Sequence, residues 1–408
     1  TLSEKQLLAM SWWNKHEYAS FDAIVCDGAV RSGKTLAMGL SFFLWAMTNF
    51  QNKKFGVCGK TISSLRRNVL SEILPRLAGL GAKWKEKRTE NLVTVTFRGH
   101  RNQFYIFGGR DESSASLIQG ITFAGILLDE VALMPQSFVE QACARCSVAG
   151  AKLWFSCNPG SPEHWFYKEW LTDEKKQKKH LHFLMRDNPI LGDEEIARAE
   201  SFFAGVFYQR FILGEWVLSE GLVYDFGEVN IVDEIPSNGE YYISIDYGTM
   251  NPFSAGLWCV LGDKATRIKE YYYNGREKAV QRTDEDYCDA VKELAKGYNI
   301  RQVIVDPSAA SFIAALRKRG FTIRKANNDV LDGIRRTAVY LKNGNIKIHR
   351  SCVDSIAEFG LYRWDDKATA DAVIKENDHA MDDIRYFANT IMKNKVGKAT
   401  SNYTPIFM

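Results

Sequence analysis

The chain has 408 residues, of which 46% are hydrophobic and 25% are charged. These fractions exclude a disordered or fibrous protein, and the length favours two domains. The longest apolar stretches fall short of the roughly 20 residues that cross a bilayer, and we find no signal-peptide pattern, so we expect a soluble, cytoplasmic protein without a membrane partner. The net charge of +4 says little about nucleic acid by itself.

The eight cysteines are scattered, which excludes a disulfide framework. Cys143 and Cys146 form a C-x-x-C pair without the second pair that a zinc site needs. Basic residues cluster at 83–88, 175–180 and 317–325, and each run is either a solvated surface or a path for phosphates.

A short apolar run at 23–27 predicts a strand, and the periodicity of residues 34–47 predicts a helix. Between them lies GAVRSGKT, a complete G-x-x-x-x-G-K-T phosphate loop. In such a loop Lys34 reaches the β- and γ-phosphates of ATP, Thr35 binds Mg²⁺, and the helix start adds its positive dipole end. The predicted nucleotide-binding residues are Gly28, Ala29, Val30, Arg31, Ser32, Gly33, Lys34 and Thr35.

The stretch GILLDE at 125–130 predicts a buried strand that ends in two acids. In P-loop enzymes the first acid, Asp129, orients Mg²⁺ through its water shell, and the second, Glu130, polarises the attacking water. The pattern therefore predicts hydrolysis of ATP and not only its binding. Further strands are predicted at 55–58, 103–107 and 152–156. They complete a doubly wound α/β layer, which predicts a P-loop NTPase domain of the ASCE type.

Three further residues are candidates for the ATPase reaction. Asn158 follows the strand at 152–156 and either senses the γ-phosphate or forms a turn with the following Pro-Gly. Arg31 could stabilise charge on the γ-phosphate from within the loop, while Arg110 or Arg145 could do so from a neighbouring subunit.

The second half of the chain predicts a different fold. Strands at 241–248, 254–262 and 266–275 form a meander, followed by a helix at 284–298 and a strand at 302–306. This order opens a ribonuclease-H-like fold, in which the first and fourth strands lie side by side and bring Asp246 close to Asp306. Divalent cations would offset the cost of such carboxylates at the ends of apolar runs.

A predicted helix at 376–392 supplies a third acid. Asp382 follows His379 by three residues and shares its face, whereas Asp383 points about a quarter-turn away. We therefore expect Asp246, Asp306 and Asp382 to bind two Mg²⁺ or Mn²⁺ ions about 4 Å apart, with His379 helping to hold metal or water, in phosphodiester cleavage. The competing interpretation of residues 245–249 as an Asp-x-Gly-Thr phosphate loop of the hexokinase and actin superfamily lacks a second glycine-bearing loop downstream.

Taken together, the motifs resemble those of the large terminase subunit of tailed bacteriophages, the motor and nuclease that packages DNA into empty capsids. The matching segments follow one another along nearly the whole chain: GAVRSGKT, QGITFAGILLDE, FSCNPG with EHWFY, RDNP, RFILGEWV, IDYG, VDPSA and DHAMDDIRY. The resemblance implies ATP-driven translocation of double-stranded viral DNA, with Asn158 as the coupling residue, and metal-dependent cleavage of concatemers. Family members often have a small residue where this chain has Asp383, so the third ligand is open between Asp382 and Asp383.

The resemblance also implies an organisation and partners: an ATPase motor at 1–165, a linker or lid at 166–220, and a nuclease domain at 221–408. The expected partners are double-stranded DNA, the portal protein, a small terminase subunit and other copies in a ring of about five. The expected location is the host cytoplasm, with transient attachment to the procapsid portal. One alternative is a P-loop helicase or repair ATPase with an appended resolvase-like nuclease. A scaffold that has lost both activities is the other alternative, and the intact Lys34 and Glu130 argue against it.

Overall fold

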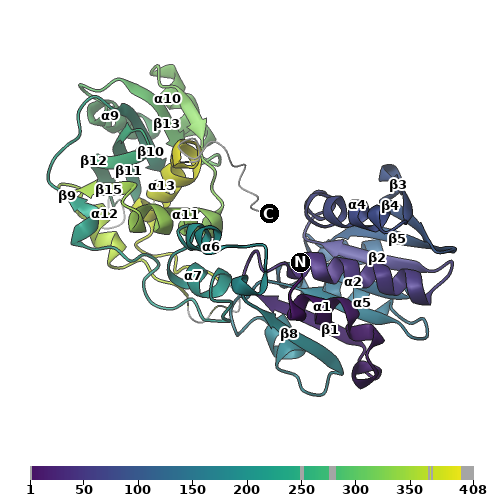
Figure 1. Ribbon diagram of the computed structural model, residues 1–408. Helices are drawn as coiled ribbons and strands as arrows, with labels where there is room; N and C mark the ends of the chain where they lie inside the picture. Colours follow the sequence, from purple (N-terminus) through teal and green to yellow (C-terminus); the bar gives the residue numbers. More distant parts are fainter. Residues whose placement is uncertain (1, 249–251, 275–281, 366–367, 369–370, 397–408) are drawn as a thin grey trace. The chain divides into compact units, whose positions relative to one another are not determined.

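The structure, a computed structural model, describes residues 2–248, 252–274, 282–365, 368 and 371–396. The chain divides into two compact units (Figure 1). The first contains the chain up to residue 200 together with 206–218, and the second contains 201–205 and the chain from 219 onward. The boundary lies within the stretch 166–220, whose role as a linker or lid stays a prediction. No helix in the described ranges is long and apolar enough to span a membrane.

The described part of the first unit contains an eight-stranded sheet in the order β3-β4-β5-β2-β6-β7-β1-β8. Its strands are β1 (Ala23–Gly28), β2 (Lys54–Gly59), β3 (Lys83–Lys87), β4 (Leu92–Phe97), β5 (His100–Gly108), β6 (Gly125–Asp129), β7 (Lys152–Ser156) and β8 (Lys178–Phe183). Along the sheet, each strand from β5 through β2, β6, β7 and β1 to β8 is parallel to the next, whereas β3 pairs with β4 and β4 with β5 in antiparallel. In this order β7 lies between β1, which precedes the phosphate loop, and β6, which ends at Asp129. A strand inserted between these two is the arrangement of the ASCE type, so the order confirms the predicted P-loop NTPase fold.

Helices cover both faces of this sheet, as the doubly wound pattern predicts. They are α1 (Glu4–Ser11), α2 (Lys34–Asn49), α3 (Ile62–Leu65), α4 (Ser71–Gly79) and α5 (Gln136–Ala144). Two further helices, α6 (Asp193–Glu200) and α7 (Gly205–Phe211), follow β8 in the chain. The helix α2 is apolar on most sides and packs on one face, where Phe42 lies 5.2 Å from Trp154 between ring centroids. On the opposite face α5 buries Phe138 and Val139.

The described part of the second unit contains a seven-stranded sheet in the order β14-β13-β10-β11-β12-β15-β9. Its strands are β9 (Ile231–Val232), β10 (Glu240–Asp246), β11 (Phe253–Leu261), β12 (Lys264–Tyr273), β13 (Ile300–Val305), β14 (Ile323–Lys325) and β15 (Ile346–His349). The strands β10, β11 and β12 form the predicted antiparallel meander, and β13 pairs with β10 in parallel. This arrangement confirms the predicted ribonuclease-H-like fold.

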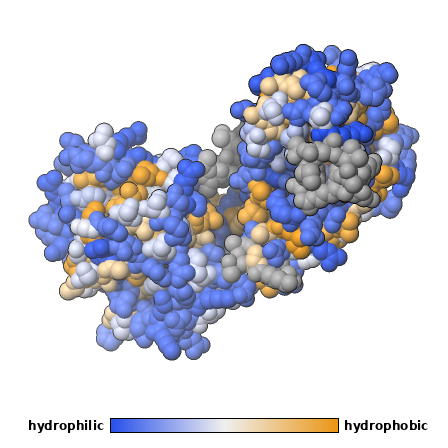
Figure 2. Space-filling model, turned by 180° about the vertical axis from the view of Figure 1, so that it is seen from behind, coloured by the Kyte–Doolittle hydropathy of each residue, from blue (hydrophilic) through white to orange (hydrophobic). Residues whose placement is uncertain are grey.

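The helices of the second unit are α9 (Asp284–Leu294), α10 (Ala310–Lys318), α11 (Val330–Lys342), α12 (Val353–Phe359), α13 (His379–Phe387) and α14 (Lys393–Val396). The helix predicted at 376–392 begins later, at His379, because Asn377 adopts a φ of 52°, which a right-handed helix cannot contain. Helix α13 packs on β10 and β11, and Phe387 stacks on Trp258 at 4.0 Å between centroids. On the face shown in Figure 2, hydrophilic residues predominate between scattered apolar patches.

Candidate active sites

The phosphate loop begins where three parallel strands end side by side. Register pairs Asp129 with Ser156 and Ser156 with Cys26, so the carboxyl ends of β6, β7 and β1 meet at one edge of the sheet. Ligands of open α/β sheets bind at this edge. Gly28 has a φ of 124°, and a Cβ there would lie 2.0 Å from the Phe183 carbonyl oxygen, so only glycine fits.

Lys34 is the buried cation of the loop. Its Nζ donates hydrogen bonds to the carbonyl oxygens of Gly28 at 3.2 Å and Ala29 at 2.9 Å, and to Asn158 Oδ1 at 2.6 Å. Burial lowers the pKa of Lys34, and the charge of nearby Asp129 opposes this shift. The structure therefore joins two residues that the sequence predicts separately, the phosphate-binding lysine and the residue at the tip of β7.

Thr35 and Asp129 lie together, as a magnesium site would require. Thr35 Oγ1 donates to Asp129 Oδ1 at 3.2 Å, and Ser156 Oγ donates to the same oxygen. Burial raises the pKa of Asp129 despite these hydrogen bonds. A hydroxyl and a carboxylate beside a phosphate loop are hard oxygen donors, so the residues present fit Mg²⁺.

Glu130 leaves the strand in an unusual backbone conformation. Its φ of 58° is left-handed and breaks the alternation of β6, so Glu130 does not follow the side-chain pattern that ends at Asp129. Burial, followed by the charge of Asp129, raises the pKa of Glu130 to about 7. A carboxyl with such a pKa is suited to accept a proton near neutral pH.

Three arginines are candidates for the ATPase reaction. Arg31 has a φ of 58°, and its carbonyl oxygen accepts a hydrogen bond from Asn188 Nδ2 at 2.7 Å. Its guanidinium makes no hydrogen bond or ion pair with any residue in the described ranges. Arg110 follows β5, and Arg145 ends α5. Their action from a neighbouring subunit stays a prediction.

A cluster beneath the loop was missed by the sequence analysis. Asp27 is buried and accepts hydrogen bonds from His180 Nε2 at 2.7 Å, His182 Nδ1 at 3.1 Å and Trp216 Nε1 at 2.7 Å. Burial acts to raise the pKa of Asp27, but these hydrogen bonds outweigh it and hold the pKa well below its usual range. The alternation of His180 and His182 is a strand signal, but the flanking lysines obscure it.

The second candidate site lies at the carboxyl ends of β10 and β13. Ile245 pairs with Val305 in parallel, so Asp246 and Asp306 follow at the same edge, as expected from the sequence. His379 Nδ1 lies 2.8 Å from Asp246 Oδ2. Burial raises the pKa of Asp246 to about 6, and the hydrogen bond with His379 opposes the shift.

Tyr386, which the sequence analysis did not single out, connects the first two acids. Its hydroxyl donates to Asp246 Oδ1 at 3.4 Å, and the same side chain acts to lower the pKa of Asp306. Asp306 further accepts hydrogen bonds from the Ser308 N–H at 2.7 Å and from Asn328 Nδ2 at 3.1 Å. Burial acts to raise the pKa of Asp306, but these hydrogen bonds lower it overall. The two carboxylates are therefore within reach of one hydroxyl.

The structure separates the environments of Asp382 and Asp383. Asp382 forms an ion pair with Arg385 at 2.9 Å, and its charge acts to raise the pKa of Asp246. Asp383 is fully buried and forms a bidentate ion pair with Arg267. A carboxylate occupied in this way has no free oxygen for a metal ion, so the geometry favours Asp382.

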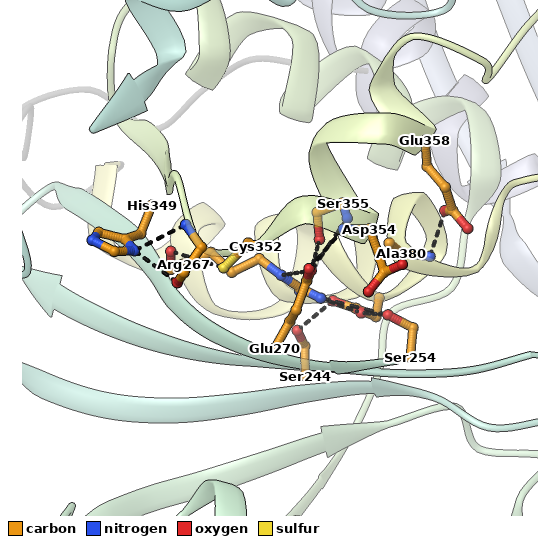
Figure 3. A network of polar contacts seen from close by, with 12 residues as sticks. Ser244, Ser254, Arg267, Glu270, His349, Cys352, Asp354, Ser355, Glu358 and Ala380 are labelled. Carbon is orange, nitrogen blue, oxygen red and sulfur yellow. Dashed lines mark hydrogen bonds and ion pairs between the residues drawn. The ribbon is translucent and has the colours of Figure 1, made fainter. Parts of the chain in front are cut away.

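The ion pair of Asp383 belongs to a network beneath the start of α13 (Figure 3). Arg267 Nε lies 3.6 Å from Glu270 Oε2, and Glu270 accepts a hydrogen bond from the Asp354 N–H at 2.8 Å. Glu358 accepts hydrogen bonds from the N–H groups of Ala380 at 2.7 Å and Met381 at 3.3 Å. The network fixes the first turn of α13 and thereby the position of Asp382.

The described residues contain no group of three or more His, Cys, Asp or Glu side chains already arranged to hold a metal ion. The predicted ligands are engaged by protein donors instead, Asp306 by Asn328 and Asp382 by Arg385. Their carboxylate oxygens are nevertheless the ligand type that Mg²⁺ and Mn²⁺ prefer, so the donor set fits these ions. Thr249, needed for the competing phosphate-loop interpretation, lies outside the described residues.

Comparisons with known proteins agree with both halves of the fold. A family profile described as "Terminase large subunit, T4likevirus-type, N-terminal" matches residues 25–231. The large subunit of the terminase from Escherichia phage T5 is 22% identical in an alignment of 248 residues that covers 56% of each chain. The chain thus spans little more than half the length of this curated relative.

Solved structures of the large terminase from a thermophilic bacteriophage match nearly the whole chain. One is 47% identical with a TM-score of 0.88 and covers 96% of this chain and 99% of its own. Complexes of that protein with ADP and with ATP-γ-S are each 46% identical, cover 96% of this chain and 100% of their own, and have TM-scores of 0.85 and 0.84. The matched profile and these structures, together with the order of strands and acids in both units, show that the chain belongs to the phage large terminase family.

Proposed function

We propose that the first unit hydrolyses ATP to move double-stranded viral DNA into a capsid, and that the second unit cuts concatemeric DNA at the start and end of packaging. The contact that carries the motor half is the 2.6 Å hydrogen bond from Lys34 to Asn158. It lies beside the Thr35–Asp129 pair, so a phosphate-binding lysine, a magnesium-binding pair and a strand-tip amide share one location. Bound ADP and ATP-γ-S in the terminase of the thermophilic phage support a nucleotide at this loop.

In the proposed ATPase reaction, Lys34 exchanges Asn158 for oxygens of the β- and γ-phosphates. Thr35 and Asp129 would hold Mg²⁺, which would supply neutralisation of the charge on the phosphates. Glu130 accepts a proton from the attacking water, in keeping with its raised pKa. Asn158, released by Lys34, contacts the γ-phosphate and returns to Lys34 after hydrolysis. This exchange would let the tip of β7 report the state of the nucleotide.

In the proposed nuclease reaction, Asp246, Asp306 and Asp382 would hold two Mg²⁺ or Mn²⁺ ions, which would supply activation of water and stabilisation of the leaving oxygen. Asp246 binds metal only when ionised, and His379 favours that state through its 2.8 Å contact. Asp382 must exchange Arg385, and Asp306 must exchange Asn328, for metal. The portal protein, a small terminase subunit and a ring of about five copies are proposed partners on the capsid.

The two activities can be tested separately in the full chain. Lys34→Ala should abolish phosphate release from ATP while leaving Mn²⁺-dependent plasmid cleavage unchanged. Asp382→Asn should do the reverse, so each variant is the control for the other. Loss of both activities in either variant would contradict the assignment of two independent sites. A capsid-dependent DNA protection assay then distinguishes packaging from helicase or repair activity.

A further inference from the structure

The outer end of the first sheet carries basic residues that the proposed phosphate chemistry does not use. Directly paired residues share a face, which places two cross-sheet rows on one side: Lys83, Thr96 and Arg101 in the first, and Lys85, Thr94, Gln103 and Lys54 in the second. Alternation along β3 adds Lys87 to the same side. We call this surface the basic face and define it by its five cations: Lys54, Lys83, Lys85, Lys87 and Arg101.

The basic face is exposed at this outer end of the sheet, whereas farther along the same side Tyr105 and Phe107 pack in the core beneath α5. All five of its cations are exposed. The residues that alternate with them point the other way, where Val93, Val95 and Phe104 are buried in the core. Glu86, the only acid in the 83–88 run, also lies on that other side and forms an ion pair with Arg66 at 2.8 Å. The strand thus separates the positive charges from the negative one.

Protection of a sheet edge does not explain this distribution. Lysines on an edge strand discourage pairing with other chains, which would account for β3 alone. Arg101 lies on β5 and Lys54 on β2, both inside the sheet. Within the described ranges, Lys87 forms an ion pair with Glu90 at 3.2 Å, whereas Lys54, Lys83, Lys85 and Arg101 form no ion pair.

We propose that the basic face binds the phosphate backbone of double-stranded DNA, a role that rests on the proposed packaging function. Alternate residues of a strand are about 6.8 Å apart, so Lys83 to Lys87 span about 14 Å, the length of about four phosphates along one DNA strand. Protein interfaces are depleted of lysine, whereas cations predominate here. The neutral members of the two rows are threonines and a glutamine, side chains that can donate hydrogen bonds to phosphate oxygens, and the row of Lys87 continues with Leu92 and Tyr105. Contacts to phosphates carry no base information, so this binding would be independent of sequence, as translocation requires.

The test compares the salt dependence of DNA binding in full-length variants. Lys83→Gln/Lys85→Gln/Arg101→Gln removes three cations of the basic face. Lys175→Gln/Lys176→Gln/Lys179→Gln removes three cations in β8 and just before it, at the opposite edge of the same sheet, and is the matched control. Fluorescence anisotropy with a duplex of random sequence is recorded over a series of salt concentrations with EDTA, which prevents cleavage. Each phosphate contact contributes about 0.9 to the slope of log K against log salt, so the first variant should lose about 2.7.

A loss of two or more in the slope, with at least tenfold weaker binding at low salt and a smaller effect in the control, supports the basic face. The proposal is overturned if the loss of slope is smaller, or if the control variant loses as much. It is also overturned if sedimentation changes while the slope does not, because that result would indicate an interface between copies of the chain. ATP hydrolysis without DNA should be unchanged in both variants and shows that they are folded. If the wild type hydrolyses no ATP, the proposed function fails independently of this result.

Discussion

Replacing Asp383 with asparagine should destabilise the second unit without removing a metal ligand. The Asp383 carboxylate is fully buried, forms a bidentate ion pair with Arg267, and accepts hydrogen bonds from Ser244 Oγ at 2.9 Å and from Ser254 Oγ. Asparagine keeps the shape but removes the charge, which leaves Arg267 with only Glu270, at 3.6 Å, to balance it. Removing one member of a buried ion pair costs about 3–5 kcal/mol.

Replacing Asp382 with asparagine should cost less stability than replacing Asp383, but it should remove most of the metal-dependent cleavage. Its partner Arg385 also donates to the carbonyl oxygens of Asn328 at 2.9 Å and Asp329 at 3.2 Å, so the arginine keeps two acceptors when Asp382 is changed. The loss in the free energy of unfolding should therefore be nearer to 1–3 kcal/mol, roughly that of an incompletely satisfied polar group. Metal-dependent cleavage should fall at least 100-fold, because a proposed ligand has lost its charge.

Scanning calorimetry of the full chain measures both effects. For a unit of this size, 1 kcal/mol corresponds to about 2–4 °C, so Asp383→Asn should lower the melting temperature of the second unit by about 6–20 °C. Added ADP should raise the melting temperature of the first unit only, because that unit contains the proposed nucleotide site. The transition that ADP does not shift is therefore that of the second unit. An Arg267→Met/Asp383→Asn double variant, which no longer buries an unbalanced charge, should melt higher than Asp383→Asn.

Cleavage is then compared below both transitions. Asp383→Asn should retain at least a tenth of wild-type plasmid cleavage with Mn²⁺. If it abolishes cleavage while folded, and Asp382→Asn cleaves normally, the two acids have been assigned the wrong way round and Asp383 is the ligand.

Three further predictions concern the first unit. The hydrogen bond with Asp27 raises the pKa of His182, so its contribution to stability is complete below about pH 6.5 and is lost as the pH rises through the folded-state pKa. Melting curves of His182→Gln at about pH 5.5 and about pH 8.5 should therefore differ less than those of the wild type. Gly28→Ala places a methyl group 2.0 Å from the Phe183 carbonyl oxygen and should abolish the thermal stabilisation by ADP. Asn158→Ala should retain that stabilisation but slow phosphate release by about 10–100-fold, and normal hydrolysis would exclude it from the reaction.

The elements that could be predicted from the sequence are those whose signals are local. The phosphate loop, the strand before Asp129 and the meander before Asp306 are each marked by apolar periodicity next to a charged or glycine-rich end. The strands β3 and β8 were not predicted because lysines occupy alternate positions of β3 and the first two positions of β8, so the alternation of polar and apolar residues that marks a half-buried strand is weak.

Contacts between distant residues were beyond prediction. Arg267 and Asp383 are 116 residues apart, and neither has a local pattern that indicates a buried partner. The same holds for Asp27 and Trp216, which are 189 residues apart. The sequence therefore indicated which acids to consider but not which protein donors hold them.

Each proposed site contains two adjacent acids, and in each the backbone decides which one faces which partner. In the first unit, Asp129 completes a strand, and the left-handed φ of Glu130 turns the second carboxyl away from the position that strand alternation would give it. In the second unit, about 100° of rotation per helical residue separates Asp382 from Asp383. Because Arg267 holds Asp383 inside the unit, Asp382 is left near Asp246 at the carboxyl edge of the sheet. A buried ion pair that has no chemical role would thus position the acid that does.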